Sequence, residues 1–185
     1  CVTPGGGGTE LFNGKNLDGW EVTDFAGGGA IKVKDGEIHM AMGELISGIN
    51  LAHENIPRTN YELEAEAMKL DGNDFFCGLT FPVGDTFASF IPGGWGGTVV
   101  GLSSIDGMDA AENETATFKQ FKTHQWYRFR VRVTPGKIQC WVDDEMVVDL
   151  LLEDRAIALR AGPIDLSVPI RSEEHTSELQ SRETI

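Results

Sequence analysis

The sequence predicts an all-β fold, a sandwich or jelly roll of two antiparallel sheets, and three observations support this prediction. Short segments in which apolar and polar residues alternate recur along the chain, as in strands that bury one face. Turn-forming residues separate these segments at short intervals. No segment shows a convincing amphipathic helical period. Many short strands joined by tight turns are typical of sandwiches and jelly rolls.

The predicted elements follow in chain order. Residues 31–42 form a hairpin that turns at Asp35-Gly36, a pair typical of two-residue hairpin loops. Alternation then predicts strands over residues 61–68 and 75–81. Three further strands are predicted to form a meander: 126–133, 138–143 and 145–150. We see no internal repeat.

Size and charge narrow the class of protein. A chain of 185 residues suits one domain, and a hydrophobic content of 41% is enough to build a core. The formal net charge of −14 repels polyanions, so we expect no nucleic-acid partner. No apolar run approaches the roughly 20 residues that span a bilayer, so we expect no transmembrane segment.

The two ends differ in character from the middle of the chain. Residues 1–9 are a flexible Gly-rich leader. Cys1 is either the lipid-bearing first residue of a bacterial lipoprotein, and so a candidate lipid anchor, or the edge of a fragment. Residues 171–185 resemble a translated sequencing adaptor and are expected to be a non-native tail. We therefore expect the domain over residues 10–170, without its last native strand.

A family resemblance begins at Leu11–Trp20, which is LFNGKNLDGW. This segment resembles the opening of the 3-keto-disaccharide hydrolase family, also described as 3-keto-glucoside 1,2-lyases and 3-keto-2-hydroxyglucal hydratases. Lys34–Ile38 and Gln125–Arg128 agree with later family segments in place and type. The resemblance covers roughly residues 10–170. Residues 72–81 depart from the commoner family pattern, because no arginine closes that strand.

The resemblance implies a concanavalin-like jelly roll of two antiparallel sheets. It also implies a bacterial, extracytoplasmic enzyme (periplasm or cell surface) whose partner is a small sugar, a 3-keto-glycoside. Such an enzyme cleaves its substrate by elimination and hydration. The alternative is a non-catalytic carbohydrate-binding sandwich module of a surface protein, since the fold alone does not separate enzymes from lectins.

Cleavage of a 3-keto sugar needs a base near C2, a donor or metal at the enolate oxygen, and an acid for the leaving oxygen. The polar loop after residues 99–102 supplies carboxylates, and we take Asp106, Asp109 and Glu112 as the catalytic candidates. Together with Glu114 they could hold a divalent metal ion. A solvated acidic loop without a catalytic role is the alternative.

Substrate-binding candidates lie on other segments. Trp95, between two Gly-Gly pairs, either stacks on a sugar ring or covers an edge of the core. The further candidates are Thr80, Ser103 and Arg130. Arg130 belongs to a basic strand face that either forms cross-strand ion pairs with the acidic face of residues 62–66 or binds a sugar.

The remaining polar and sulfur side chains carry weaker signals. Cys77 and Cys140 are expected as buried thiols, or as a bridge if their strands adjoin. Asn113 begins a glycosylation sequon by pattern only. Three histidines follow no metal-ligand spacing and are expected at the surface: His39, His53 and His124.

Overall fold

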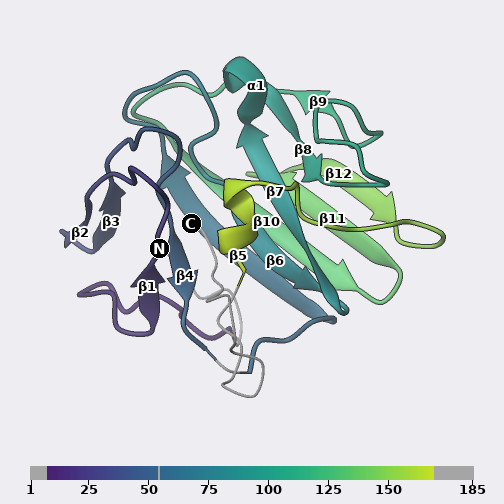
Figure 1. Ribbon diagram of the computed structural model, residues 1–185, viewed down its shortest axis with the longest axis horizontal. Coiled ribbons are helices and arrows are strands. Elements are labelled where there is room, and N and C mark those ends of the chain that lie inside the picture. Colours follow the sequence, from purple (N-terminus) through teal and green to yellow (C-terminus); the bar gives the residue numbers. More distant parts are fainter. Residues whose placement is uncertain (1–7, 54, 169–185) are drawn as a thin grey trace. The chain divides into compact units, whose positions relative to one another are not determined.

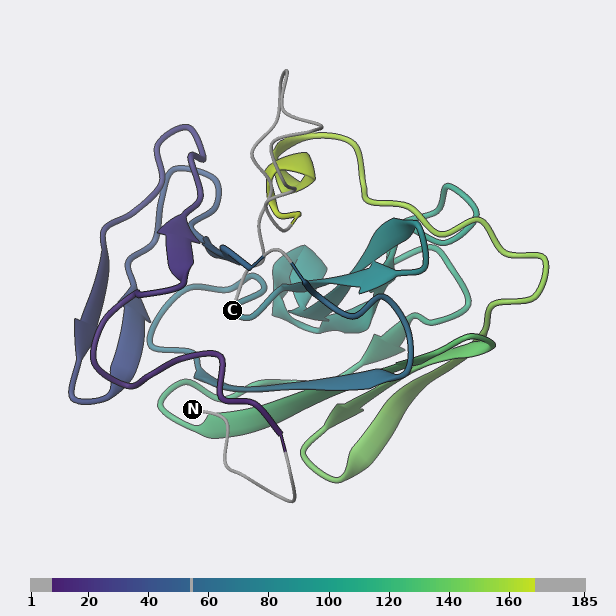
Figure 2. The ribbon, with the colours of Figure 1, turned by 90° about the horizontal axis from the view of Figure 1, so that it is seen from below.

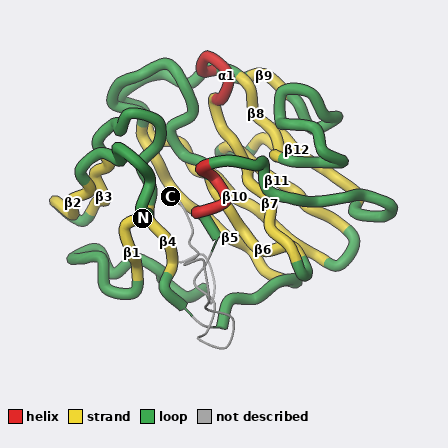
Figure 3. The backbone as a smooth tube through the Cα atoms, viewed as in Figure 1, coloured by secondary structure: helices red, strands yellow, loops and turns green. Residues whose placement is uncertain are grey.

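The computed structural model describes residues 8–53 and 55–168, and it confirms the all-β jelly-roll sandwich (Figure 1). Within this part of the chain only the short segments α1 (Gly94–Gly97) and η1 (Pro163–Leu166) are labelled helical (Figure 3). The predictions for Cys1, for residues 1–7 of the leader and for the tail 171–185 lie outside the described residues. The chain divides into two compact units: Ile56–Arg160, and Cys1–Asn55 with Ala161–Ile185.

The N-terminal unit contains two pairs of antiparallel strands: β1 (Trp20–Val22) with β4 (Ile49–Leu51), and β2 (Ile31–Lys34) with β3 (Glu37–Met40). The pair β2–β3 confirms the predicted hairpin. Its two turn residues, Asp35 and Gly36, both have positive φ, at 54° and 82°. Positive φ at both central positions is the geometry that gives a hairpin turn the twist of its strands.

The segment that carries the family resemblance forms a local turn in this unit. Trp20 is buried, and its indole Nε1–H donates a 2.9 Å hydrogen bond to the carbonyl of Leu11. Inside the turn, the side-chain oxygen of Asn13 accepts from the main-chain N–H groups of Lys15 at 2.8 Å and Asn16 at 3.0 Å. These residues therefore close a turn on a buried tryptophan, which is a structural role.

The larger unit is a sandwich of two four-stranded antiparallel sheets. The first has the order β6-β7-β8-β9 and the second the order β12-β11-β10-β5. Figure 2 shows the second sheet, with its green meander, as a layer below the teal strands of the first. The strands of the first sheet are β6 (Leu79–Val83), β7 (Thr86–Gly93), β8 (Val99–Ser103) and β9 (Thr117–Phe118). Those of the second are β5 (Tyr61–Met68), β10 (Trp126–Thr134), β11 (Lys137–Val142) and β12 (Glu145–Leu151).

The meander and the strand at 61–68 are confirmed, whereas the strand predicted over 75–81 begins later, at Leu79, and ends at Val83. The reason lies in the aromatic side chains before it. Phe76 leaves the sheet and packs edge-on against Phe121 and Phe129, with ring centroids 5.2 and 5.8 Å apart. Aromatic packing at this end of the core therefore takes precedence over continued strand alternation.

The core lies between the two sheets. Phe129 of β10 is fully buried, and its ring centroid lies 6.3 Å from that of Phe90 on β7. Cys77 and Cys140 are buried free thiols and form no bridge with each other. Burial raises the pKa of Cys77 to about 12, since a thiolate is poorly solvated in an apolar core. The prediction of buried thiols is confirmed.

The outer face of the second sheet carries the predicted charged strands as neighbours. The register places three pairs opposite each other: Arg128 and Glu66, Arg130 and Glu64, Arg132 and Glu62. Arg132 lies 2.5 Å from Glu62 as an ion pair. Arg130 instead stacks its guanidinium 4.2 Å from the ring centroid of Trp141. The arginines of this face are therefore engaged within the sheet.

Candidate functional site

A row of hydroxyl side chains crosses the face of the first sheet that points away from the core. Thr80, Ser89 and Ser103 are register partners on β6, β7 and β8. Their neighbours Leu79 and Phe90 point into the core, and alternation turns the hydroxyls to the other face. The three are almost completely buried, and the hydroxyls of Thr80 and Ser89 lie 2.8 Å apart. The row ends at Ser103.

Beyond Ser103, the row leads to one of the predicted carboxylates. The hydroxyl of Ser103 donates to Oδ1 of Asp109 at 3.3 Å, and Nε of Arg160 lies 3.2 Å from Oδ2. The Asp109 side chain is 23% exposed and that of Arg160 is 57% exposed. The carboxylate therefore sits between a buried hydroxyl and a solvent-facing guanidinium.

Trp95 presents its ring beside the same arginine. The ring centroid lies 5.6 Å from the guanidinium carbon of Arg160, and the residue is 40% exposed. Trp95 sits in α1, which is a left-handed turn rather than a true helix, because Trp95 and Gly96 have φ of 48° and 87°. Gly97 is required, since a Cβ there would lie 2.9 Å from the carbonyl oxygen of Asn73. The turn thus holds an aromatic ring at the surface.

Four residues therefore form one connected group, which we call the Asp109 cluster: Trp95, Ser103, Asp109 and Arg160. The sequence singled out Trp95, Ser103 and Asp109, but it did not single out Arg160. An ion pair, a stacking ring and a hydroxyl in contact with a carboxylate are groups that can bind a polar ring and move a proton.

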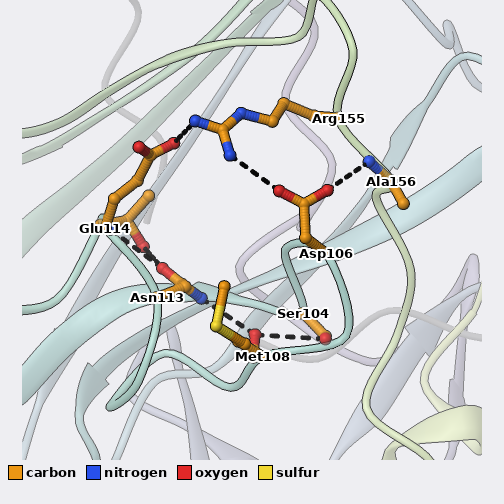
Figure 4. Close-up of polar contacts among 8 residues, drawn as sticks. Ser104, Asp106, Met108, Asn113, Glu114, Arg155 and Ala156 are labelled. Atoms are coloured by element: carbon orange, nitrogen blue, oxygen red, sulfur yellow. Dashed lines mark hydrogen bonds and ion pairs between the residues drawn. The ribbon is translucent and has the colours of Figure 1, made fainter.

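Asp106 lies in the same loop and has different partners. Its Oδ2 accepts from Nη1 of Arg155 at 2.7 Å, and its Oδ1 accepts from the main-chain N–H of Ala156 at 2.8 Å (Figure 4). Glu114 reaches the other side of the same guanidinium, at 2.5 Å. The hydrogen bond from Ala156 and then that from Arg155 lower the pKa of Asp106 below its usual value. Both carboxylate oxygens of Asp106 are thus engaged by the protein.

Asn113 organises the loop from inside. It is buried, and its side-chain amide donates to the carbonyls of Leu102, Met108 and Asp109 at 2.7, 3.0 and 2.9 Å. Its side-chain oxygen accepts from the main-chain N–H of Thr115 at 2.9 Å. The amide of the sequon is therefore buried and fully used within the loop.

The structure leaves the other candidates outside the Asp109 cluster. Glu112 is exposed, and within residues 8–53 and 55–168 its carboxylate has no polar partner. Arg130 lies on the outer face of the second sheet, on Trp141. Thr80 belongs to the hydroxyl row but is fully buried.

The described residues hold no group of three or more His, Cys, Asp or Glu side chains arranged to bind a metal ion. The three histidines within the described residues lie at the surface: His39 is half-exposed and lies 3.3 Å from Glu37, and His53 and His124 are exposed. In the same part of the chain, no helix is both long and apolar enough to cross a membrane.

Two surface hollows, of about 370 and 510 Å³, lie away from the Asp109 cluster. Arg155 lines both of them. The first is bounded by residues 114–117 and by β12, and the second by turns at the end of the sandwich near Gly84 and Pro135. We place the candidate site at the Asp109 cluster because it alone of these places joins a carboxylate, a cation and an exposed ring.

Comparison with known families bears on this site. A family model described as the 3-keto-alpha-glucoside-1,2-lyase-like domain matches residues 7–178. Searches of curated proteins and of solved structures each found no match. The match covers nearly the whole sequence and confirms the resemblance first seen at residues 11–20.

Proposed function

Because the chain belongs to the 3-keto-alpha-glucoside-1,2-lyase-like domain family, which gives it a carbohydrate-related role, we propose that it cleaves 3-keto-glycosides by elimination and hydration. The observation that carries this proposal is the Asp109–Arg160 pair, which joins a partly exposed carboxylate to a cation beside the ring of Trp95. A base and an oxyanion partner side by side are what proton removal next to a ketone requires.

In the proposed reaction, Asp109 accepts the proton from C2 of the sugar. The electrons of the C–H bond form a C2–C3 double bond, and negative charge collects on the C3 oxygen, where the guanidinium of Arg160 stabilises it. The enolate then re-forms the ketone, and the electrons of the C2–C3 double bond form a double bond between C1 and C2. The C1–O bond breaks at the same time, and Asp109 gives its proton to the leaving oxygen. Water adds its hydroxyl at C1 and its proton at C2, so the net result is hydrolysis.

Two residues have supporting roles in this proposal. The ring of Trp95 stacks on an apolar face of the pyranose, and the hydroxyl of Ser103 orients the Asp109 carboxylate. Thr80 and Arg130 stay predictions for substrate binding, as Asp106 and Glu112 do for catalysis.

A non-catalytic carbohydrate-binding module is the second candidate, because an exposed ring such as that of Trp95 can also bind a sugar without catalysis. The full chain incubated with p-nitrophenyl 3-keto-glucoside in D2O separates the two. Turnover releases the phenol and places deuterium at C2 of the product. A keto sugar that is bound but unchanged, with a divalent cation and with a chelator alike, would leave the binding module as the better description.

Asp109→Asn tests the assignment of the base. We expect turnover to fall by about 10²-fold or more, because an amide does not accept the C2 proton. Asp144→Asn is the matched control, since Asp144 also pairs with an arginine, Arg128, at 2.7 Å. Undiminished turnover in Asp109→Asn would remove Asp109 from the mechanism.

A further part of the proposal concerns where the chain works. We propose an extracytoplasmic location in a bacterial cell, which the family resemblance implies. Fractionation of bacterial cells that produce the full chain tests this location. Recovery of the protein in the cytoplasmic fraction alone would contradict it.

A further inference from the structure

The segment that carries Arg160 is paired with the loop that carries Asp109. Ile157 and Ile105 form an antiparallel bridge. On one side of it, the N–H of Ser104 donates to the carbonyl of Ala158 at 2.7 Å, and the N–H of Ala158 donates back at 3.2 Å. On the other side, the N–H of Asp106 donates to the carbonyl of Ala156 at 2.8 Å. Residues 156–158 are thereby added to residues 104–106 as a short ladder.

Side chains reinforce this ladder at two places. The hydroxyl of Thr86 on β7 donates to the carbonyl of Ile157 at 3.2 Å, and charged side chains hold the end at Ala156. Asp106 binds the N–H of Ala156 and the guanidinium of Arg155, and Arg155 also reaches Glu114 (Figure 4). We call these three side chains, Asp106, Arg155 and Glu114, the Asp106 latch. They are partly exposed, between 30% and 50%. Charge-assisted hydrogen bonds of this kind fix geometry even where they contribute little to stability.

The ladder ends two residues before Arg160. Arg160 is more exposed than any residue of the latch, and among the described residues its guanidinium has one ion pair, with Asp109, and one ring contact, with Trp95. The distance between its guanidinium and Asp109 is therefore set by the backbone path of residues 155–158. A small displacement of such a group is costly in catalysis, because a misplacement of about 1 Å can lower the rate by about 10²-fold.

We infer that Asp106 is a positioning residue: it fastens residues 155–158 to the loop so that Arg160 meets Asp109. The kinetic part of this inference rests on the proposed function, whereas its geometric part does not. Asp106 is poorly placed to act as a base itself, since both of its carboxylate oxygens already accept hydrogen bonds from the chain.

A double-mutant cycle tests the kinetic part. In the otherwise unchanged protein, we expect Asp106→Ala to lower kcat by about 10-fold and to change KM less than twofold. In the Arg160→Ala background, the same substitution is expected to change kcat by less than about twofold, because the group it positions is gone. Equal losses of kcat in both backgrounds would overturn the inference. They would mean that Asp106 acts independently of Arg160, either in the reaction itself or in the stability of the fold.

The geometric part is read from the Nε–H resonance of Arg160 in full-length protein labelled with ¹⁵N. We expect Asp106→Ala to shift this resonance toward that of a free arginine and to speed its exchange with water. Asp144→Ala, which removes another 2.7 Å Asp–Arg pair, is the control and should leave it unchanged. If Asp106→Ala folds poorly, Arg155→Lys replaces it, since a single ammonium cannot bridge Asp106 and Glu114 as a guanidinium does.

The two readouts separate the possible failures. If the wild-type protein turns over no 3-keto-glycoside, the proposed function is wrong. The Nε–H resonance of Arg160 still tests in that case whether Asp106 positions Arg160. A resonance that is unchanged in both Asp106→Ala and Arg155→Lys would overturn the positioning role, whatever the turnover.

Discussion

Nε of Arg160 lies 3.2 Å from Oδ2 of Asp109, and this ion pair joins two loops that are far apart in the sequence. More than half of the Arg160 side chain is exposed, so the pair is well solvated and contributes little to stability. Ser103 holds the carboxylate from its other side, and the proposed function gives the pair a role in catalysis.

Arg160→Ala is therefore expected to affect turnover far more than stability. Loss of the group at the enolate oxygen should lower kcat/KM for a 3-keto-glycoside by about 10²–10³-fold. The free energy of unfolding should change by less than about 1 kcal/mol, because the pair is exposed. Steady-state kinetics and urea unfolding check both parts.

The matched control for that substitution is Arg132→Ala, which removes the exposed ion pair with Glu62 on the other sheet. It should leave turnover unchanged. Arg160→Lys should recover only part of the activity, since an ammonium cannot bind an oxyanion and Asp109 in the planar manner of a guanidinium. Equal activity of the Arg160→Ala variant and the wild type would contradict the role of Arg160.

Trp95→Ala is expected to raise KM for the keto sugar by roughly 10-fold, the loss that follows removal of a stacking ring. Trp95→Phe should keep most of the affinity, because a smaller ring still offers an apolar face. Trp126→Ala is the control, since Trp126 is exposed to a similar extent, 44% against 40%. Initial rates over a range of substrate concentrations distinguish an effect on KM from one on kcat. If Trp126→Ala raises KM as much as Trp95→Ala does, Trp95 is not a specific stacking residue for the sugar.

Much of the fold could be predicted because its strands bury one face. Residues 61–68 and 126–134 alternate, and the structure pairs them as β5 and β10. β7 went unpredicted, since TFASFIPG is buried on both faces and shows no alternation. Ser89, the middle of the hydroxyl row, was missed with that strand.

The candidate site was predicted only in part, for a related reason. Asp106 and Asp109 look alike in the sequence, and only a distant segment of the chain gives them different partners. Residues 155–158 bind Asp106, and the same segment brings Arg160 to Asp109. The ladder at Ile157 leaves no periodic signal, because it is only a few residues long. The Leu11–Trp20 motif identified the family through a structural turn, so it held no information on the site.

Asn113→Asp is expected to destabilise the larger unit by about 2–4 kcal/mol. The substitution replaces a buried amide that donates to the carbonyls of Leu102, Met108 and Asp109 with an oxygen that faces them. Asn73→Asp, at an exposed position, should cost less than about 0.5 kcal/mol. Urea unfolding measures both, and a similar small change in the two variants would contradict the role of Asn113 in holding the loop.

The Asp106 latch gives the protein a defined dependence on pH. Hydrogen bonds from Ala156 and Arg155 lower the folded-state pKa of Asp106 below the 3.8 of a free side chain. Its contribution to stability is therefore fully present above about pH 5 and is lost as the pH falls below 3.8 through the folded-state pKa.

The stability difference between wild type and Asp106→Asn should then be constant from about pH 5 to 7 and should shrink below pH 3.8. Urea unfolding of both proteins across this range measures it, with Asp144→Asn as the baseline for loss of a carboxylate elsewhere in the same unit. A difference that widens on acidification would mean that the protonated form of Asp106, rather than the carboxylate bound to Arg155, is the one that the fold prefers.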